Sequence, residues 1–119
     1  MDLPSRMRAD LTAALRERDR DTARVLRTVL SAIANAEAQP AADGEPLSLR
    51  GDGPIAGASD GLGSADVVRR ELTVEDLRAV VRSERDECLA SAADLEARGA
   101  TDVAAALRAD AAVLERYVG

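Results

Sequence analysis

Apolar side chains recur every three or four residues in four segments of this chain, and this spacing constrains the fold more than any other feature. The spacing matches one face of an α-helix, and such a face is stable only when it is buried against another element. The segments cover residues 4–18, 22–38, 73–98 and 101–118. Their apolar lines are formed by Leu3, Met7, Leu11 and Leu15, by Val25, Leu26, Val29, Leu30, Ile33 and Ala36, by Leu77, Val80, Val81, Cys88, Ala92 and Leu95, and by Val103, Leu107, Ala111, Leu114 and Val118.

Residues with strong preferences for helix ends flank these segments. Asp21 is a suitable N-cap for the second helix, and Thr73 with Asp76 forms a capping box for the third, with Asp in place of the usual Glu or Gln. Gly99 is placed to end the third helix, and Thr101 to cap the fourth. The sequence therefore predicts an all-α fold of two antiparallel helical hairpins packed as a four-helix bundle.

Between the second and third helices lies a stretch rich in glycine and proline. Residues 39–63 contain six of the eight glycines and three of the four prolines of the chain. Both residue types interrupt regular structure, and a connection of this length is unusual inside a compact domain. We expect a single helical domain over residues 1–119, with residues 39–72 as a loop or insertion.

The composition excludes several classes of function. Tyr117 is the single aromatic residue, so single-stranded nucleic acid has no row of rings on which to stack. The absence of histidine excludes a histidine general base, a histidine-containing zinc site and the Glu-x-x-His pairs of di-iron bundles. We therefore expect no metal and no cofactor.

The charge and the cysteine content bear on partners and compartment. A net charge of −6 disfavours bulk nucleic-acid binding, although residues 1–38 carry seven arginines against six acids. Cys88 has no second cysteine to pair with, and the sequence has neither an 18-residue apolar run nor a signal peptide at its start. We expect a cytoplasmic protein without a membrane partner, in which Cys88 is a buried, inert thiol.

Two carboxylates interrupt the apolar lines. Glu84 falls on the line of the third helix, and Glu37 continues the line of the second helix at its end. Burial raises the pKa of a carboxyl unless an arginine compensates it. Because buried charges are normally paired, we predict that these carboxylates pair with arginines such as Arg27 or Arg78 or accept backbone N–H hydrogen bonds. An acid–base pair or a set of metal ligands is the less favoured interpretation.

Three arginines fall on one side at the start of the second helix, at the spacing i, i+4, i+7. They are Arg20, Arg24 and Arg27. Such a cluster could hold phosphates or an acidic partner surface. Acidic residues are interleaved with it, so a solvated surface of internal ion pairs is the favoured alternative.

Three sequence blocks resemble the YqeY family, which is related to the C-terminal helical region of the B subunit of tRNA-dependent glutamine amidotransferase. The block "VLRTVLSAIANAEA" is similar to the family signature V-x-R-x-x-x-x-A-x-x-N-x-E, through Val25, Arg27, Ala32, Asn35 and Glu37. The block "ELTVEDLRAVVRSE" leads to a glutamate that recurs in the family and falls on Glu84. The hairpin "EARGATDVAAALRADAAVLERYV" is the third block.

The resemblance implies a helical domain with binding residues at Arg27, Asn35, Glu37 and Glu84, beside the cluster of Arg20 and Arg24. Family members continue after this region into a tail domain, which in the amidotransferase subunit is implicated in holding tRNA. We expect that tail to be lacking, and a role in tRNA binding with it. The basic run that tends to follow the family glutamate is replaced here by Asp86, Glu87 and Cys88.

In the amidotransferase, the amidase nucleophile belongs to another subunit and the ATP site to another part of the B subunit. The resemblance therefore implies a non-catalytic accessory or interaction module, without catalytic residues of its own, whose partners are amidotransferase subunits. The alternatives are a direct role in carbon–nitrogen ligase activity with glutamine as the amide donor, or tRNA binding. A structural homodimer that pairs alanine-rich faces also stays open.

Overall fold

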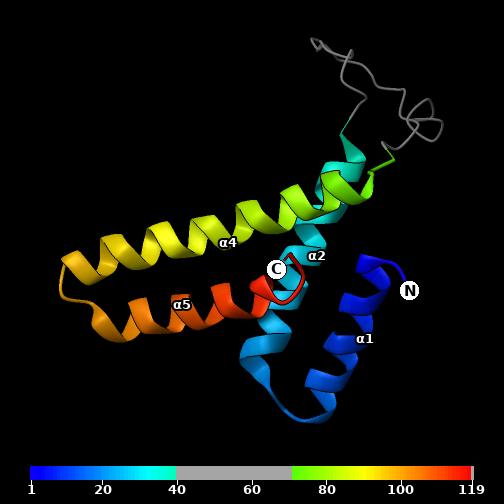
Figure 1. The fold of residues 1–119 in the computed structure, drawn as a ribbon. Coiled ribbons are helices and arrows are strands. Elements are labelled where there is room, and N and C mark those ends of the chain that lie inside the picture. Colours follow the sequence, from blue (N-terminus) through cyan, green and yellow to red (C-terminus); the bar gives the residue numbers. More distant parts are fainter. Residues whose placement is uncertain (40–70, 119) are drawn as a thin grey trace, which may run out of the picture. The chain divides into compact units, whose positions relative to one another are not determined.

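The structure, a computed structural model, describes residues 1–39 and 71–118. This part of the chain contains four helices and no strand (Figure 1). They are α1 (Leu3–Arg16), α2 (Arg20–Ala38), α4 (Val74–Ala97) and α5 (Thr101–Glu115). The all-α prediction is confirmed. The predicted glycine- and proline-rich loop lies almost entirely outside the described residues.

The chain divides into two units, and the first holds most of the described structure. It comprises residues 1–33 and 73–119, while the second comprises residues 34–72. Within the first unit, α4 and α5 run side by side in opposite directions, and α1 is followed by α2 running back in the opposite direction (Figure 1). The predicted α4–α5 hairpin is therefore confirmed, and α1 and α2 are consecutive helices of opposite direction.

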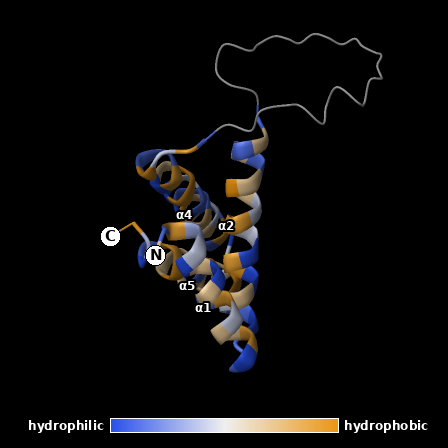
Figure 2. Ribbon diagram, turned by 90° about the vertical axis from the view of Figure 1, so that its right-hand side faces the viewer, coloured by the Kyte–Doolittle hydropathy of each residue, from blue (hydrophilic) through white to orange (hydrophobic). Residues whose placement is uncertain are grey.

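Aliphatic side chains of all four helices form the core of this unit. Met7, Leu26 and Val81 are completely buried, and the helices show the mixture of hydrophobic and hydrophilic residues typical of amphipathic segments (Figure 2). The other buried apolar residues are Ala14, Ala23, Val25, Val29, Ile33, Leu77, Ala92, Ala104, Ala111, Leu114 and Tyr117. Leu15 and Val103, both predicted to be buried, are 49% and 51% exposed because each lies in a terminal turn of its helix.

The turn after each first helix of a hairpin has the same hydrogen bonds. After α4, the Ala100 N–H donates to the Leu95 carbonyl and the Gly99 N–H to the Glu96 carbonyl, with Gly99 at a φ of +90°. This is the Schellman arrangement, in which glycine avoids the strain of a left-handed backbone.

After α1, Asp19 and Arg18 donate in the same way, to Ala14 and Leu15. Here the left-handed position is occupied by Arg18, at a φ of +61°, although this conformation is unfavourable for a residue with a side chain. The turn sets where the next helix starts, so Asp19 rather than the predicted Asp21 accepts the hydrogen bond that caps α2, from the Thr22 N–H.

The predicted N-cap of α4 is present, whereas that of α5 is not. Thr73 and Asp76 each accept a hydrogen bond from the other's backbone N–H, at 3.0 Å, which confirms the capping box of α4. Thr101 does not cap α5, because the turn at Gly99 leaves Ala100 in that position, without a side-chain hydrogen bond.

Tyr117 joins the end of the chain to α1. Its hydroxyl donates a hydrogen bond of 2.6 Å to Oδ2 of Asp10, and the Arg6 guanidinium lies 4.8 Å from the centre of its ring. Arg6 also donates to the carbonyl of Arg116. Burial, followed by the Asp10 hydrogen bond, raises the pKa of Tyr117 to about 12. Tyr117 and Arg6 therefore anchor the end of the chain to α1.

Candidate functional site

A small cavity of about 50 Å³ opens where α2, α4 and α5 meet within the first unit. Valine and leucine side chains form its apolar walls, and charged or polar groups from all three helices reach it. Its lining consists of Arg24, Val25, Thr28 and Val29 from α2, Glu84 and Cys88 from α4, and Asp110 and Leu114 from α5. The cavity therefore brings Arg24 and Glu84, two of the predicted site residues, to one place.

Arg24 is held on one side of this cavity by a two-point ion pair. Its Nη1 and Nη2 atoms donate to Oδ2 and Oδ1 of Asp110, each at 3.1 Å. The Asp110 side chain is 9% exposed and that of Arg24 is 55% exposed. The hydrogen bonds and charge of Asp110 raise the pKa of Arg24. A second carboxylate also pairs with Arg24, because Oδ1 of Asp21 lies 3.7 Å from Nη2 of Arg24. The predicted internal ion pairing is thus confirmed for this arginine.

Asp110 is the functional-site residue that the sequence reasoning missed. The alanine-rich helix was interpreted through its apolar line alone, although Asp110 lies between Leu107 and Leu114 at helical spacing. A carboxylate in that position signals burial against a cation. What no local pattern reveals is the partner, which is 86 residues away in the sequence.

Glu84 is half-buried, and its pKa is raised, first by desolvation and second by the negative charge of Glu87. The predicted pairing with an arginine is wrong for this residue, since no hydrogen bond or ion pair joins Glu84 to another described residue. Arg78 pairs instead with Glu75, at 3.4 Å within the first turns of α4, and Arg27 is exposed. Glu84 thus carries its charge into the cavity without a cation of its own.

Cys88 is a half-buried thiol at the same cavity. Desolvation and then the carboxylates of Asp110, Glu84 and Glu87 raise its pKa, and only Arg24 acts in the opposite direction. Because the thiolate is the nucleophilic form, a raised pKa keeps this sulfur unreactive. The predicted full burial of Cys88 is wrong, since the thiol is half-buried, whereas the direction of its pKa shift agrees with the predicted low reactivity.

The remaining predicted site residues lie elsewhere. Arg20 and Arg27 are exposed, and neither forms an ion pair with a described residue. Asn35 is exposed and Glu37 half-buried, and both belong to the unit of residues 34–72 rather than the unit that holds the cavity.

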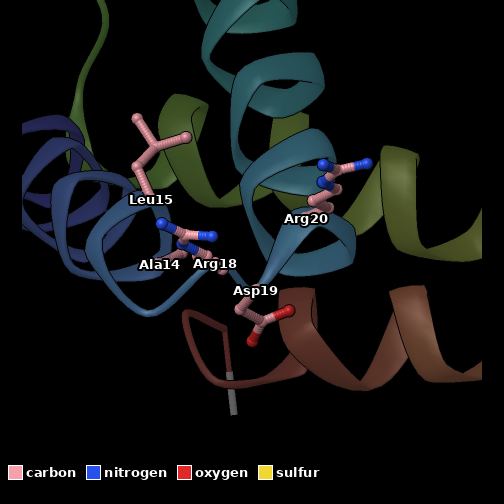
Figure 3. Close-up of a pocket in the computed structure, with 5 residues that line it drawn as sticks. All are labelled: Ala14, Leu15, Arg18, Asp19 and Arg20. Carbon is pink, nitrogen blue, oxygen red and sulfur yellow. The ribbon is translucent and has the colours of Figure 1, made fainter.

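Arg20 borders a second hollow, of about 270 Å³, at the turn between α1 and α2. Its other lining residues are Ala14, Leu15, Arg18 and Asp19 (Figure 3). In Figure 3 the Arg18 and Arg20 side chains point in different directions, so they do not converge on one point. The Asp19 carboxylate, which caps α2, supplies an opposite charge beside them. Of the three predicted arginines, Arg20 lines this hollow, Arg24 is paired with Asp110, and Arg27 is exposed.

Comparison of the chain with known protein families, with curated proteins and with solved structures finds no match. The described residues also hold neither a membrane-spanning helix nor a metal-ligand group. Within residues 1–39 and 71–118, no helix is long and apolar enough to cross a membrane. The same residues contain no group of three or more His, Cys, Asp or Glu side chains placed to hold a metal ion.

Proposed function

We propose that this chain is a non-catalytic accessory module of the YqeY type, which binds subunits of the glutamine-dependent tRNA amidotransferase in the cytoplasm. The four-helix bundle with an inserted loop over residues 39–72 is the architecture that belongs to this proposal. The observation that carries the proposal is the arrangement of the charged side chains at the cavity. Arg24 forms an ion pair with Asp110, and Glu84 lies in a cavity of about 50 Å³.

The size of the cavity supports binding without catalysis. Sites that enclose a substrate usually measure about 300–1,000 Å³. The cavity at Glu84, of about 50 Å³, is several-fold smaller. A nucleophile needs an adjacent base or a lowered pKa to be activated. The pKa of the Cys88 thiol in this cavity is raised, so Cys88 lacks that activation.

The test is association with purified amidotransferase subunits. We expect the chain to co-elute with the subunits in size-exclusion chromatography, equally well before and after RNase treatment, and to show no glutaminase or ligase turnover of its own. Glutaminase activity that disappears in Glu84→Gln would contradict the proposal, and so would the absence of any association.

A second candidate, tRNA binding, is favoured by one observation: Arg20 and Arg27 are exposed and make no ion pair with described residues. Binding through such arginines weakens steeply with salt, because each phosphate contact releases counterions. The double variant Arg20→Glu, Arg27→Glu should then abolish binding of tRNA. Arg98→Glu is the control, because Arg98 is equally a surface arginine and, among the described residues, pairs with the exposed Asp94. Binding that is insensitive to salt refutes this candidate.

A further inference from the structure

Glu84 differs from the other carboxylate of the cavity in its surroundings. Asp110 accepts two hydrogen bonds from Arg24, whereas Glu84 has no hydrogen bond or ion pair with a described residue. The charged and titratable groups around Glu84 are Arg24 from α2, Glu87 and Cys88 from α4, and Asp110 from α5. Because Arg24 and Asp110 neutralise each other, the charge that remains among the residues lining the cavity is that of Glu84, and Glu87 acts on it from outside the lining.

A negative charge in a partly apolar cavity is stabilised most by a cation that enters the cavity with it. Arg24 cannot serve as that cation without leaving the two-point pair with Asp110, which would strand a carboxylate that is only 9% exposed. A cation that pairs with Glu84 would therefore come from outside the described part of the chain.

We propose that the cavity binds the primary ammonium group of a lysine side chain that a partner protein presents to Glu84. This inference rests on the proposed function, because the partner is the protein that the module binds. In the complex, the ammonium donates hydrogen bonds to the Glu84 carboxylate, and the lysine methylenes pack against Val25, Val29 and Leu114.

The dimensions of the cavity select this chemical class of ligand. A cavity of about 50 Å³ accommodates an ammonium group, which is close in size to a water molecule with its share of about 30 Å³. A guanidinium is larger and planar, and it binds best where two acceptors face it side by side. Glu84 offers one free carboxylate, because the acceptors of Asp110 are occupied by Arg24. A metal ion is not favoured, since the described residues contain no group of three suitable ligands.

The test uses N-acetyl-lysine amide as the probe, titrated into the isotope-labelled full chain and followed by NMR. We expect saturable shifts at Thr28, Glu84 and Cys88, together with a lower pKa of the Glu84 carboxyl at saturation. Two comparison probes, one uncharged and one with a guanidinium in place of the ammonium, sharpen the result. N-acetyl-norleucine amide, which has the same stem without the charge, should cause no shift, and N-acetyl-arginine amide should bind at least threefold more weakly.

Variants assign the effect to one carboxylate. Glu84→Gln should weaken binding of the probe at least tenfold, and Glu87→Gln less than threefold, because Glu87 does not line the cavity. Glu17→Gln, at the exposed end of α1, is the matched control and should bind as wild type. Circular dichroism verifies that each variant is folded. Equal binding of the norleucine probe, or full binding by a folded Glu84→Gln variant, would overturn the inference.

The inference and the proposed function fail separately. If the chain associates with the amidotransferase subunits while the lysine probe does not bind, the ammonium site is wrong and the proposed function stands. If the probe binds at Glu84 while the subunits do not associate, the ammonium site stands and the identity of the partner is wrong.

Discussion

Replacement of Arg24 by methionine tests the energetic role of the ion pair with Asp110. The variant keeps a long side chain over the surface but leaves the Asp110 carboxylate, 9% exposed, without either of its two hydrogen bonds. Breaking a fully buried pair costs about 3–5 kcal/mol. The Arg24 side chain is 55% exposed, so water screens the pair and the cost should be roughly half, about 2 kcal/mol. In a domain of this size that loss lowers the melting temperature by about 8 °C.

The assay is urea unfolding at neutral pH, with Arg98→Met as the matched control. Arg98 pairs with Asp94 at 3.3 Å, but both side chains are more than half exposed, so its replacement should change the free energy of unfolding by less than about 0.5 kcal/mol. The double variant Arg24→Met, Asp110→Leu should recover most of the loss, because it removes the stranded charge. An Arg24→Met variant as stable as wild type would refute the reasoning.

Three further predictions follow from the pKa shifts and the backbone. Because the pKa of Glu84 is raised, the folded state binds the carboxyl proton more tightly than the unfolded state, and stability is lost as pH rises above the ordinary carboxyl pKa. Glu84→Gln should therefore increase the free energy of unfolding, measured with urea, more at pH 7 than at pH 4. An ultraviolet absorbance titration should show the Tyr117 hydroxyl ionising near pH 12, and the free energy of unfolding should fall from about pH 10 upward. Tyr117→Phe should lower the free energy of unfolding by about 1–2 kcal/mol, because it removes the hydrogen bond to Asp10. A titration midpoint near pH 10 in the folded chain would contradict the buried hydrogen bond. Gly99→Ala should cost about 1–2 kcal/mol through backbone strain alone, since a Cβ there meets no atom within 4 Å, whereas Arg18→Gly should stabilise by up to about 1 kcal/mol; thermal melts that show the opposite signs would refute the two-turn comparison.

Helix number and helix faces could be predicted from the sequence, because apolar spacing reports directly on which side of a helix is buried. The capping box of Thr73 and Asp76 was equally readable, since both partners lie within four residues. The start of α2 was not. Asp19 and Asp21 are equally good capping residues, and the choice between them depends on the left-handed turn at Arg18, a conformation that the residue type argues against.

The candidate site was predictable in part. The position of Glu84 on an apolar line correctly indicated partial burial, whereas the favoured pairing with an arginine was wrong and the pKa of Glu84 is raised. The absence of an arginine partner for Glu84 was not predictable. Arg24, which lines the same cavity, pairs with Asp110 instead, and the contact between α2 and α5 that allows this pair is seen only in the folded chain. Asn35 and Glu37, which the family resemblance groups with Glu84, belong to the other unit of the chain.

Glu84 carries its charge into the cavity between α2, α4 and α5 without an ion pair to a described residue. A carbon-detected NMR titration of the Glu84 carboxyl in the free chain measures this directly. We predict a midpoint above the ordinary glutamate pKa of about 4.3. A midpoint at or below that value would show that a cation or hydrogen-bond donor of the chain already neutralises Glu84, and it would remove the basis for the proposed lysine site.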